Sequence, residues 1–143
     1  MIVLGTLLAA ASFCLAQGTT EKKTEVKKLG IKQTSASCGK EMFTQYCAPC
    51  HGVNGTGNGP AAPAMKSQPT NLTQLAKKRD GKYLGNIVAG VLKFGSDGAH
   101  AAHGSADMPI WRPLFLSLDK YHDSVVQQRI SNIVTYIETL QAK

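Results

Sequence analysis

The chain has 143 residues, which is enough for one domain with a modest core and extra residues at its ends. Aromatic residues make up only 6% of it, and no run alternates apolar and polar residues as strands of a β-rich domain do, so the sequence argues against a β-rich domain. The formal charge is +7, of which residues 21–32 supply +3 through five Lys against two Glu. No aromatic residue is interleaved with these lysines, so we interpret them as a solvated tail and exclude a nucleic-acid-binding protein.

Residues 1–16 form an apolar stretch without a charged side chain, as in an export signal. Cys14-Leu15-Ala16 resembles the small-residue site at which such a signal is cleaved, which would leave Gln17 first, although the usual basic start is missing. Two alternatives stay open. One is an uncleaved membrane anchor, although spanning a bilayer takes about 20 apolar residues. The other is a lipid on Cys14, which the large neighbour Phe13 disfavours. Each places the remaining chain outside the cytoplasm, in the periplasm or another extracytoplasmic space, and the last two would tether it to a membrane.

Residues 17–37 are polar and carry seven charged side chains. Such a segment buries too little apolar surface to offset the entropy of ordering it. We therefore predict a flexible linker over residues 17–37, followed by one domain over residues 38–143.

The motif Cys47-Ala48-Pro49-Cys50-His51 is a C-x-x-C-H sequence, the attachment signature of c-type haem. Two thiols separated by two residues reach both vinyl groups of one haem and form two thioethers. The next residue, His51, then projects toward the iron as the proximal ligand. We predict one covalently attached haem c, which cannot be lost outside the cell.

Two other uses of this cysteine pair are less consistent with the sequence. A disulfide or a redox-active C-x-x-C pair usually lies in a βαβ context, and none is visible. Zinc would need a second closely spaced pair of ligands, and the remaining candidates are scattered along the chain: Cys38, His100, His103 and His122.

Met108 is the predicted distal ligand of the haem iron. A thioether is soft and favours Fe(II), so a Met ligand raises the reduction potential relative to His. Pro109 biases Met108 toward an extended conformation, and the Gly- and Ala-rich residues 95–108 suit a loop that carries a ligand.

Other residues compete with Met108 for this role. Met42 lies only five residues before Cys47 and cannot reach the far face of the haem, whereas Met65 lies in a Pro-rich loop. Met108 could also be a methionine that fills the core. The main rivals as ligands are His100 and His103.

Periodicity predicts helices over residues 37–46, 71–79 and 82–94, and a last helix from Ser124. Gly95 is placed to end the third helix. In the last helix, Ser124 and Gln127 fit a capping box. Its apolar positions follow helical spacing: Val126, Ile130, Ile133, Val134, Ile137 and Leu140.

From Cys38 to the C-terminus the chain resembles class I cytochromes c, in particular bacterial monohaem cytochrome c domains. The resemblance implies the all-α cytochrome c fold, with three to five helices around one covalent haem. Gly39 and Phe43 match the small and aromatic positions of the first helix, and Tyr136 matches an aromatic position of the last. The resemblance implies that these helices cross, with Gly39 near Tyr136.

The resemblance also implies roles at the site. Gly59-Pro60 matches the loop whose proline carbonyl accepts the proximal histidine proton, so Pro60 would orient His51. Met108-Pro109-Ile110-Trp111 resembles a Met-Pro-x-Trp segment, which makes Trp111 and Arg112 candidates to lie near the haem propionates. The predicted haem-binding residues are therefore Cys47, Cys50, His51, Pro60, Met108, Trp111 and Arg112, with His51 and Met108 as the iron ligands.

The predicted function is electron transfer rather than enzymatic catalysis. Lysines around the haem edge would dock to acidic redox proteins: Lys66, Lys77, Lys78 and Lys93. One alternative is a haem peroxidase or reductase with an open distal site, where His100 or His103 would serve as acid or base. Another is a cytochrome subunit of a larger membrane dehydrogenase or oxidase complex. We expect a monomer in which Cys38 is an unpaired thiol, with a Cys38-linked dimer as the alternative.

Overall fold

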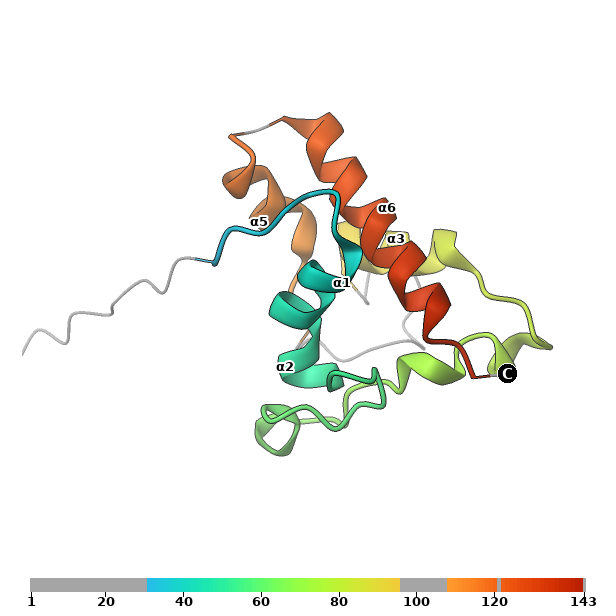
Figure 1. Cartoon of the computed structure of the whole chain (residues 1–143). Helices are drawn as coiled ribbons and strands as arrows, with labels where there is room; N and C mark the ends of the chain where they lie inside the picture. Colours follow the sequence, from blue (N-terminus) through green and yellow to red (C-terminus); the bar gives the residue numbers. More distant parts are fainter. Residues whose placement is uncertain (1–30, 96–107, 121, 143) are drawn as a thin grey trace, which may run out of the picture.

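A computed structural model describes residues 31–95, 108–120 and 122–142, and the elements in these ranges are helices without a strand (Figure 1). Three longer helices follow the C-x-x-C-H motif: α3 (Gly85–Phe94), α5 (Trp111–Leu118) and α6 (Asp123–Thr139). Short 3-10 turns lie before α3, at Ala62–Ala64, Leu72–Gln74 and Lys77–Arg79. The predicted all-α fold is confirmed. In the described parts of the chain, no helix is long and apolar enough to cross a membrane.

The first helix is longer than predicted, because it continues through the C-x-x-C-H motif. Helix α1 (Gly39–Met42) leads into a π-helical turn, Phe43–Cys47, which leads into α2 (Ala48–His51). A π turn widens the helix and shifts the direction of the side chains that follow. Met42, Phe43, Tyr46 and Cys47 are all buried.

The first and last helices cross as the resemblance implied. A side chain at Gly39 would clash with the backbone oxygen of Asn132 and would lie 3.0 Å from Cβ of Tyr136. One turn later, the rings of Phe43 and Tyr136 lie 5.2 Å apart between centroids. Figure 1 shows α6 running across α1 at this point. The predicted contact between Gly39 and Tyr136 is confirmed.

Two predicted local features were wrong. Residues 71–79 form two 3-10 turns rather than one helix, and the Asn71 side chain accepts a hydrogen bond from Thr73 N at the first of them. The last helix begins at Asp123, and no side chain caps it. The carboxylate of Asp123 instead pairs with Arg112 at 2.8 Å.

Residues 31–37 pack against the domain, although the sequence predicted a flexible linker up to residue 37. Thr34 is 6% exposed, and its hydroxyl lies 2.8 Å from the hydroxyl of Tyr46. The Ala36 carbonyl accepts a hydrogen bond from Asn132 on α6. The predicted export signal and residues 17–30 of the predicted linker lie outside the described residues.

Candidate functional site

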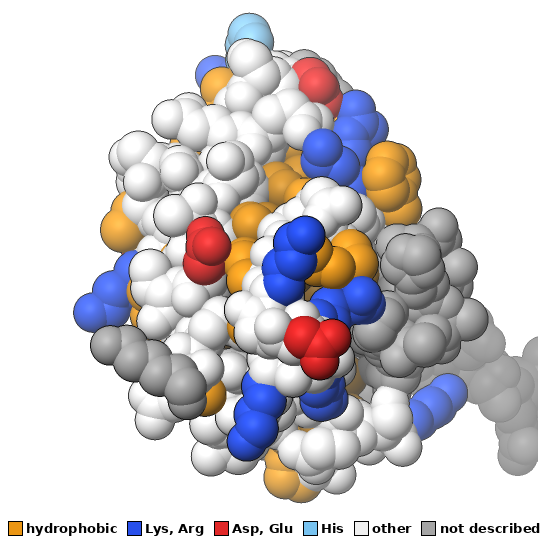
Figure 2. Space-filling model, turned by 90° about the vertical axis from the view of Figure 1, so that its right-hand side faces the viewer, with side chains coloured by type: hydrophobic (Ala, Val, Ile, Leu, Met, Phe, Trp, Pro, Cys, Tyr) orange, Lys and Arg blue, Asp and Glu red, His pale blue; other side chains and the backbone are white. Residues whose placement is uncertain are grey.

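A single cavity brings most of the predicted site residues together. It opens between the first helix, the loop before Leu72, helix α3 and the start of α5. Figure 2 shows hydrophobic side chains exposed between Lys and Arg side chains on the face that looks to the right in Figure 1. The cavity is lined by Cys47, Cys50, His51, Met65, Thr70, Leu75, Lys78, Arg79, Tyr83, Val88, Leu92, Met108, Trp111 and Ile137, among others.

His51 is oriented by a main-chain carbonyl. Its Nδ1 lies 2.9 Å from the carbonyl oxygen of Thr70. Because a carbonyl can only accept, Nδ1 carries the proton and Nε2 keeps its lone pair. Burial lowers the pKa of His51, which also favours the neutral ring. A neutral imidazole with a free Nε2 is the form that ligates a metal.

The acceptor for His51 differs from the prediction, which named the carbonyl of Pro60. Pro60 is exposed and does not line the cavity. Gly59 next to it donates from its backbone N to the carbonyl of Cys50 at 3.0 Å, so the loop packs on the backbone of the motif. A side chain at Gly59 would clash with the carbonyl of Pro49. Only a residue without a side chain therefore lets this loop pack against the backbone of Pro49 and Cys50.

Cys47 and Cys50 both line the cavity, and no disulfide joins them. Burial, with a smaller contribution from neighbouring Cys50, raises the pKa of the Cys47 thiol to about 12. Redox-active C-x-x-C pairs depend on the opposite shift, toward an easily formed thiolate. No three His, Cys, Asp or Glu side chains gather into a metal site in the described ranges. The cysteine pair therefore fits thioether attachment better than disulfide exchange.

Two methionines line the cavity, Met108 and Met65. Met42 lies elsewhere: it is fully buried, and its sulfur accepts a contact from Arg129 at 3.6 Å. The rival ligands His100 and His103 lie outside the described residues.

Trp111 and Arg112 have different surroundings. Trp111 is buried, lines the cavity and lies 5.5 Å from the ring of Tyr46. Arg112 does not line the cavity and pairs with Asp123, so it is not placed to meet a haem propionate as predicted. The basic side chains at the cavity are those of Lys78 and Arg79.

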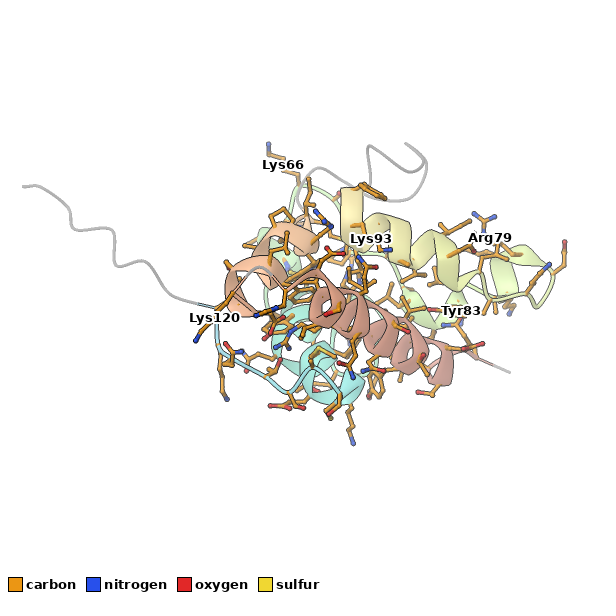
Figure 3. All side chains as sticks on the ribbon, turned by 90° about the horizontal axis from the view of Figure 1, so that it is seen from above. Lys66, Arg79, Tyr83, Lys93 and Lys120 are labelled. Atoms are coloured by element: carbon orange, nitrogen blue, oxygen red, sulfur yellow. The ribbon has the colours of Figure 1, made fainter. Side chains whose placement is uncertain are left out.

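Arg79 and Tyr83 also line the cavity, although neither was among the residues predicted for the site. Figure 3 shows both beside the start of α3, at the opposite end of the molecule from Lys120. The hydroxyl of Tyr83 donates to the carbonyl of Val134 on α6 at 2.9 Å, and burial raises the pKa of Tyr83. The run Lys77-Lys78-Arg79 was the available signal, because a short basic turn just before an apolar helix is suited to an anionic group of a buried ligand.

The donor set of the cavity fits a covalent haem. Two thiols, a histidine with an available Nε2 and a thioether meet among apolar side chains, and two basic residues line the same cavity. Thiols, imidazole and thioether are the groups that attach and ligate c-type haem.

A comparison with protein-family models matches residues 36–141 of the chain to the family described as cytochrome c. The chain belongs to the cytochrome c family. Its cofactor is therefore one covalent haem c, and it takes part in haem-based electron transfer with redox partners. Cytochrome c domains are usually extracytoplasmic and are typically electron carriers. Neither the curated proteins nor the solved structures contain a significant match.

Proposed function

We propose that this cytochrome c carries single electrons on a haem that is attached to Cys47 and Cys50 and ligated by His51 and Met108. The observation that carries this proposal is the hydrogen bond from His51 Nδ1 to the Thr70 carbonyl, within a cavity that both thiols and Met108 also line. This bond directs the lone pair of Nε2 to the iron and makes the imidazole a stronger donor.

Met108 is favoured over Met65 by its place in the chain. Met65 belongs to the loop that also contains Thr70, which already holds His51. Met108 comes from a separate segment, directly before α5, and Pro109 favours an extended backbone at this position. The two axial ligands would thus come from independent parts of the fold.

The bound haem supplies one reversible redox step, Fe(II)/Fe(III), with both axial positions filled. The apolar side chains that line the cavity would exclude water from the haem, and they include Leu75, Val88, Leu92 and Ile137. A rigid apolar wall reorganises little when the charge of the iron changes. A thioether ligand adds stability to Fe(II).

A basic edge of the cavity would dock the redox partners. Lys77 and Lys78 are exposed in the turn that leads to Arg79, and Lys78 and Arg79 reach the cavity. Lys66 is also exposed, and Lys93 is partly buried on α3. A basic rim with exposed apolar side chains suits brief encounters with acidic proteins.

The proposed location is the periplasm, reached through cleavage of residues 1–16 as an export signal. Residues 17–30 would then link the new N-terminus to the domain. We expect a monomer, in which exposed Cys38 stays a free thiol.

The attachment is tested with three matched cysteine variants, produced in a host that matures c-type cytochromes. Cys47→Ala and Cys50→Ala should each leave at most one thioether, and the reduced pyridine haemochrome band should move to longer wavelength. Cys38→Ala should keep the two-thioether spectrum. An unchanged spectrum in Cys47→Ala or Cys50→Ala would contradict the proposed attachment.

The carrier function is tested by redox titration of the wild-type holoprotein with and without cyanide. We expect one reversible one-electron wave, and slow or weak cyanide binding because the distal position is filled. Fast, tight cyanide binding would instead indicate an open iron and favour a peroxidase or reductase.

A further inference from the structure

Helix α5 has its buried contacts on one face, and Met108 lies three residues before this helix begins. Trp111, Phe115 and Asp119 are spaced four residues apart, so they share this face. The rings of Trp111 and Phe115 stack with their centroids 5.6 Å apart. Whatever holds this face of α5 therefore also holds the segment from which Met108 enters the cavity.

Arg129 on α6 holds the C-terminal half of this face. Its side chain is 2% exposed, and its Nε and Nη2 donate to the two carboxylate oxygens of Asp119 at 2.6 and 2.9 Å. The guanidinium carbon lies 5.9 Å from the centre of the Phe115 ring. A bidentate, buried arginine pair of this kind fixes the orientation as well as the distance of its partner.

A relay of hydrogen bonds connects Arg129 to Tyr46, whose ring contacts Trp111 at the N-terminal end of α5. Arg129 Nη1 donates to the Thr34 hydroxyl at 3.1 Å, and the Tyr46 hydroxyl donates to the Lys32 carbonyl at 2.7 Å. A guanidinium only donates and a carbonyl only accepts, so the Thr34 hydroxyl between them donates to Tyr46 at 2.8 Å. The ring of Tyr46 lies 5.5 Å from Trp111.

We propose that Arg129 is a positioning residue for Met108, acting on α5 through Asp119 and through Thr34 and Tyr46. This inference rests on the proposed ligation of the haem by Met108. Residues 31–34, which supply the Lys32 carbonyl and the Thr34 hydroxyl, would thus help to position Met108. Removing one link of the relay should raise the population in which α5 and Met108 have moved away from the iron.

Imidazole binding to the ferric holoprotein at fixed pH measures this population, because imidazole takes the position that the distal ligand leaves. Thr34→Val removes the hydroxyl between Arg129 and Tyr46 and leaves the pair with Asp119 in place. We expect roughly threefold to tenfold tighter imidazole binding, the factor by which one lost buried hydrogen bond shifts such an equilibrium. Thr34→Ser keeps the hydroxyl and should bind imidazole like the wild type.

Tyr46→Phe breaks the same link from its other side and keeps the ring. Because it also removes the bond to the Lys32 carbonyl, it should bind imidazole at least as tightly as Thr34→Val. The double variant should bind imidazole no more tightly than Tyr46→Phe alone, because the link between Thr34 and Tyr46 is already lost in that variant. Ile133→Val is the control for general loss of stability, since Ile133 is fully buried on α6 outside the relay. It should lower the melting temperature without changing the affinity for imidazole.

The inference is overturned if Thr34→Val leaves imidazole affinity unchanged, or if Ile133→Val raises it equally at a similar loss of melting temperature. The far-red sulfur-to-iron band of the ferric protein separates this failure from failure of the proposed ligation. If wild-type protein lacks that band, Met108 is not the ligand, and both proposals fall.

Discussion

The Nδ1 atom of His51 lies 2.9 Å from the carbonyl oxygen of Thr70, nineteen residues along the chain. The glycine-rich loop after the motif holds Thr70 at this position through hydrogen bonds to the segment around it. Gly57 accepts a hydrogen bond from the side chain of Gln68, and the backbone N of Leu72 donates to the Gly55 carbonyl at 2.7 Å. The orientation of the proximal histidine therefore depends on how closely the loop after the motif packs against the loop that precedes Leu72.

Gly57→Ala should raise the reduction potential of the haem. A side chain at Gly57 would clash with the carbonyl of Pro69, the residue before Thr70, and would weaken the hydrogen bond to His51. An imidazole with a weaker acceptor at Nδ1 is a poorer donor to the iron and stabilises Fe(III) less. Spectroelectrochemical titration of the holoprotein measures the change.

Gly81→Ala is the matched control for this change. Gly57 has φ +86° and Gly81 has φ +80°, so alanine is strained by about 1 kcal/mol or more at both positions. Nothing lies within 4 Å of the added carbon at Gly81. This variant should lose stability but keep the wild-type potential. Equal shifts in the two variants would show that backbone strain alone moves the potential.

Arg79→Gln should lower the reduction potential by on the order of tens of millivolts, because a positive charge at the apolar cavity favours the reduced haem by roughly 1 kcal/mol. Arg79 is partly buried and lines the cavity. The same titration applies, carried out at low ionic strength so that screening stays small.

Arg112→Gln is the matched control for Arg79→Gln. It removes one positive charge at a residue that does not line the cavity, so it tests whether the reduction potential depends on where the charge lies. Arg112 pairs with Asp123, and the two side chains are 40% and 54% exposed. The potential should stay at its wild-type value, and stability should change by less than about 1 kcal/mol. If Arg112→Gln shifted the reduction potential more than Arg79→Gln, Arg112 would lie near the haem propionates, as the resemblance implied.

Gly39→Ala should destabilise the fold by about 1–3 kcal/mol, the usual cost of overpacking a tight contact. The added methyl group would press against the backbone oxygen of Asn132, which cannot move without shifting α6. Urea unfolding of the holoprotein measures the loss. Lys40→Ala, at an exposed neighbouring position, should have an effect within about 0.5 kcal/mol. A tolerated alanine at Gly39 would mean that the helices can separate without cost.

The sequence predicted the parts of the site that lie on one continuous motif or one helix face. The C-x-x-C-H spacing is a local property, and it pointed to Cys47, Cys50 and His51 before any fold was known. Gly39 and Tyr136 could be paired because the resemblance supplied the crossing of two helices. The π turn at Phe43–Cys47 had no such signal in the sequence.

The parts that the sequence did not predict depend on long-range contacts. The acceptor for His51 is a backbone carbonyl, and any residue can supply one, so Thr70 could not be distinguished from Pro60. Arg112 and Arg79 are chemically equal in a sequence, and only the fold separates the one at the cavity from the one at Asp123. Arg129 is a charged residue on the last helix, and its sequence position gave no sign that it would be buried. In the structure it is buried and pairs with Asp119.

The most direct test of His51/Met108 ligation compares Met108→Ala with Met65→Ala, the two methionines that line the cavity. The ferric holoprotein of each variant is examined for the weak far-red band that arises from sulfur bound to iron. We predict that the wild type and Met65→Ala show the band and a low-spin spectrum, whereas Met108→Ala loses the band. Loss of the band in Met65→Ala but not in Met108→Ala would make Met65 the ligand. A band absent from all three proteins would contradict methionine ligation altogether.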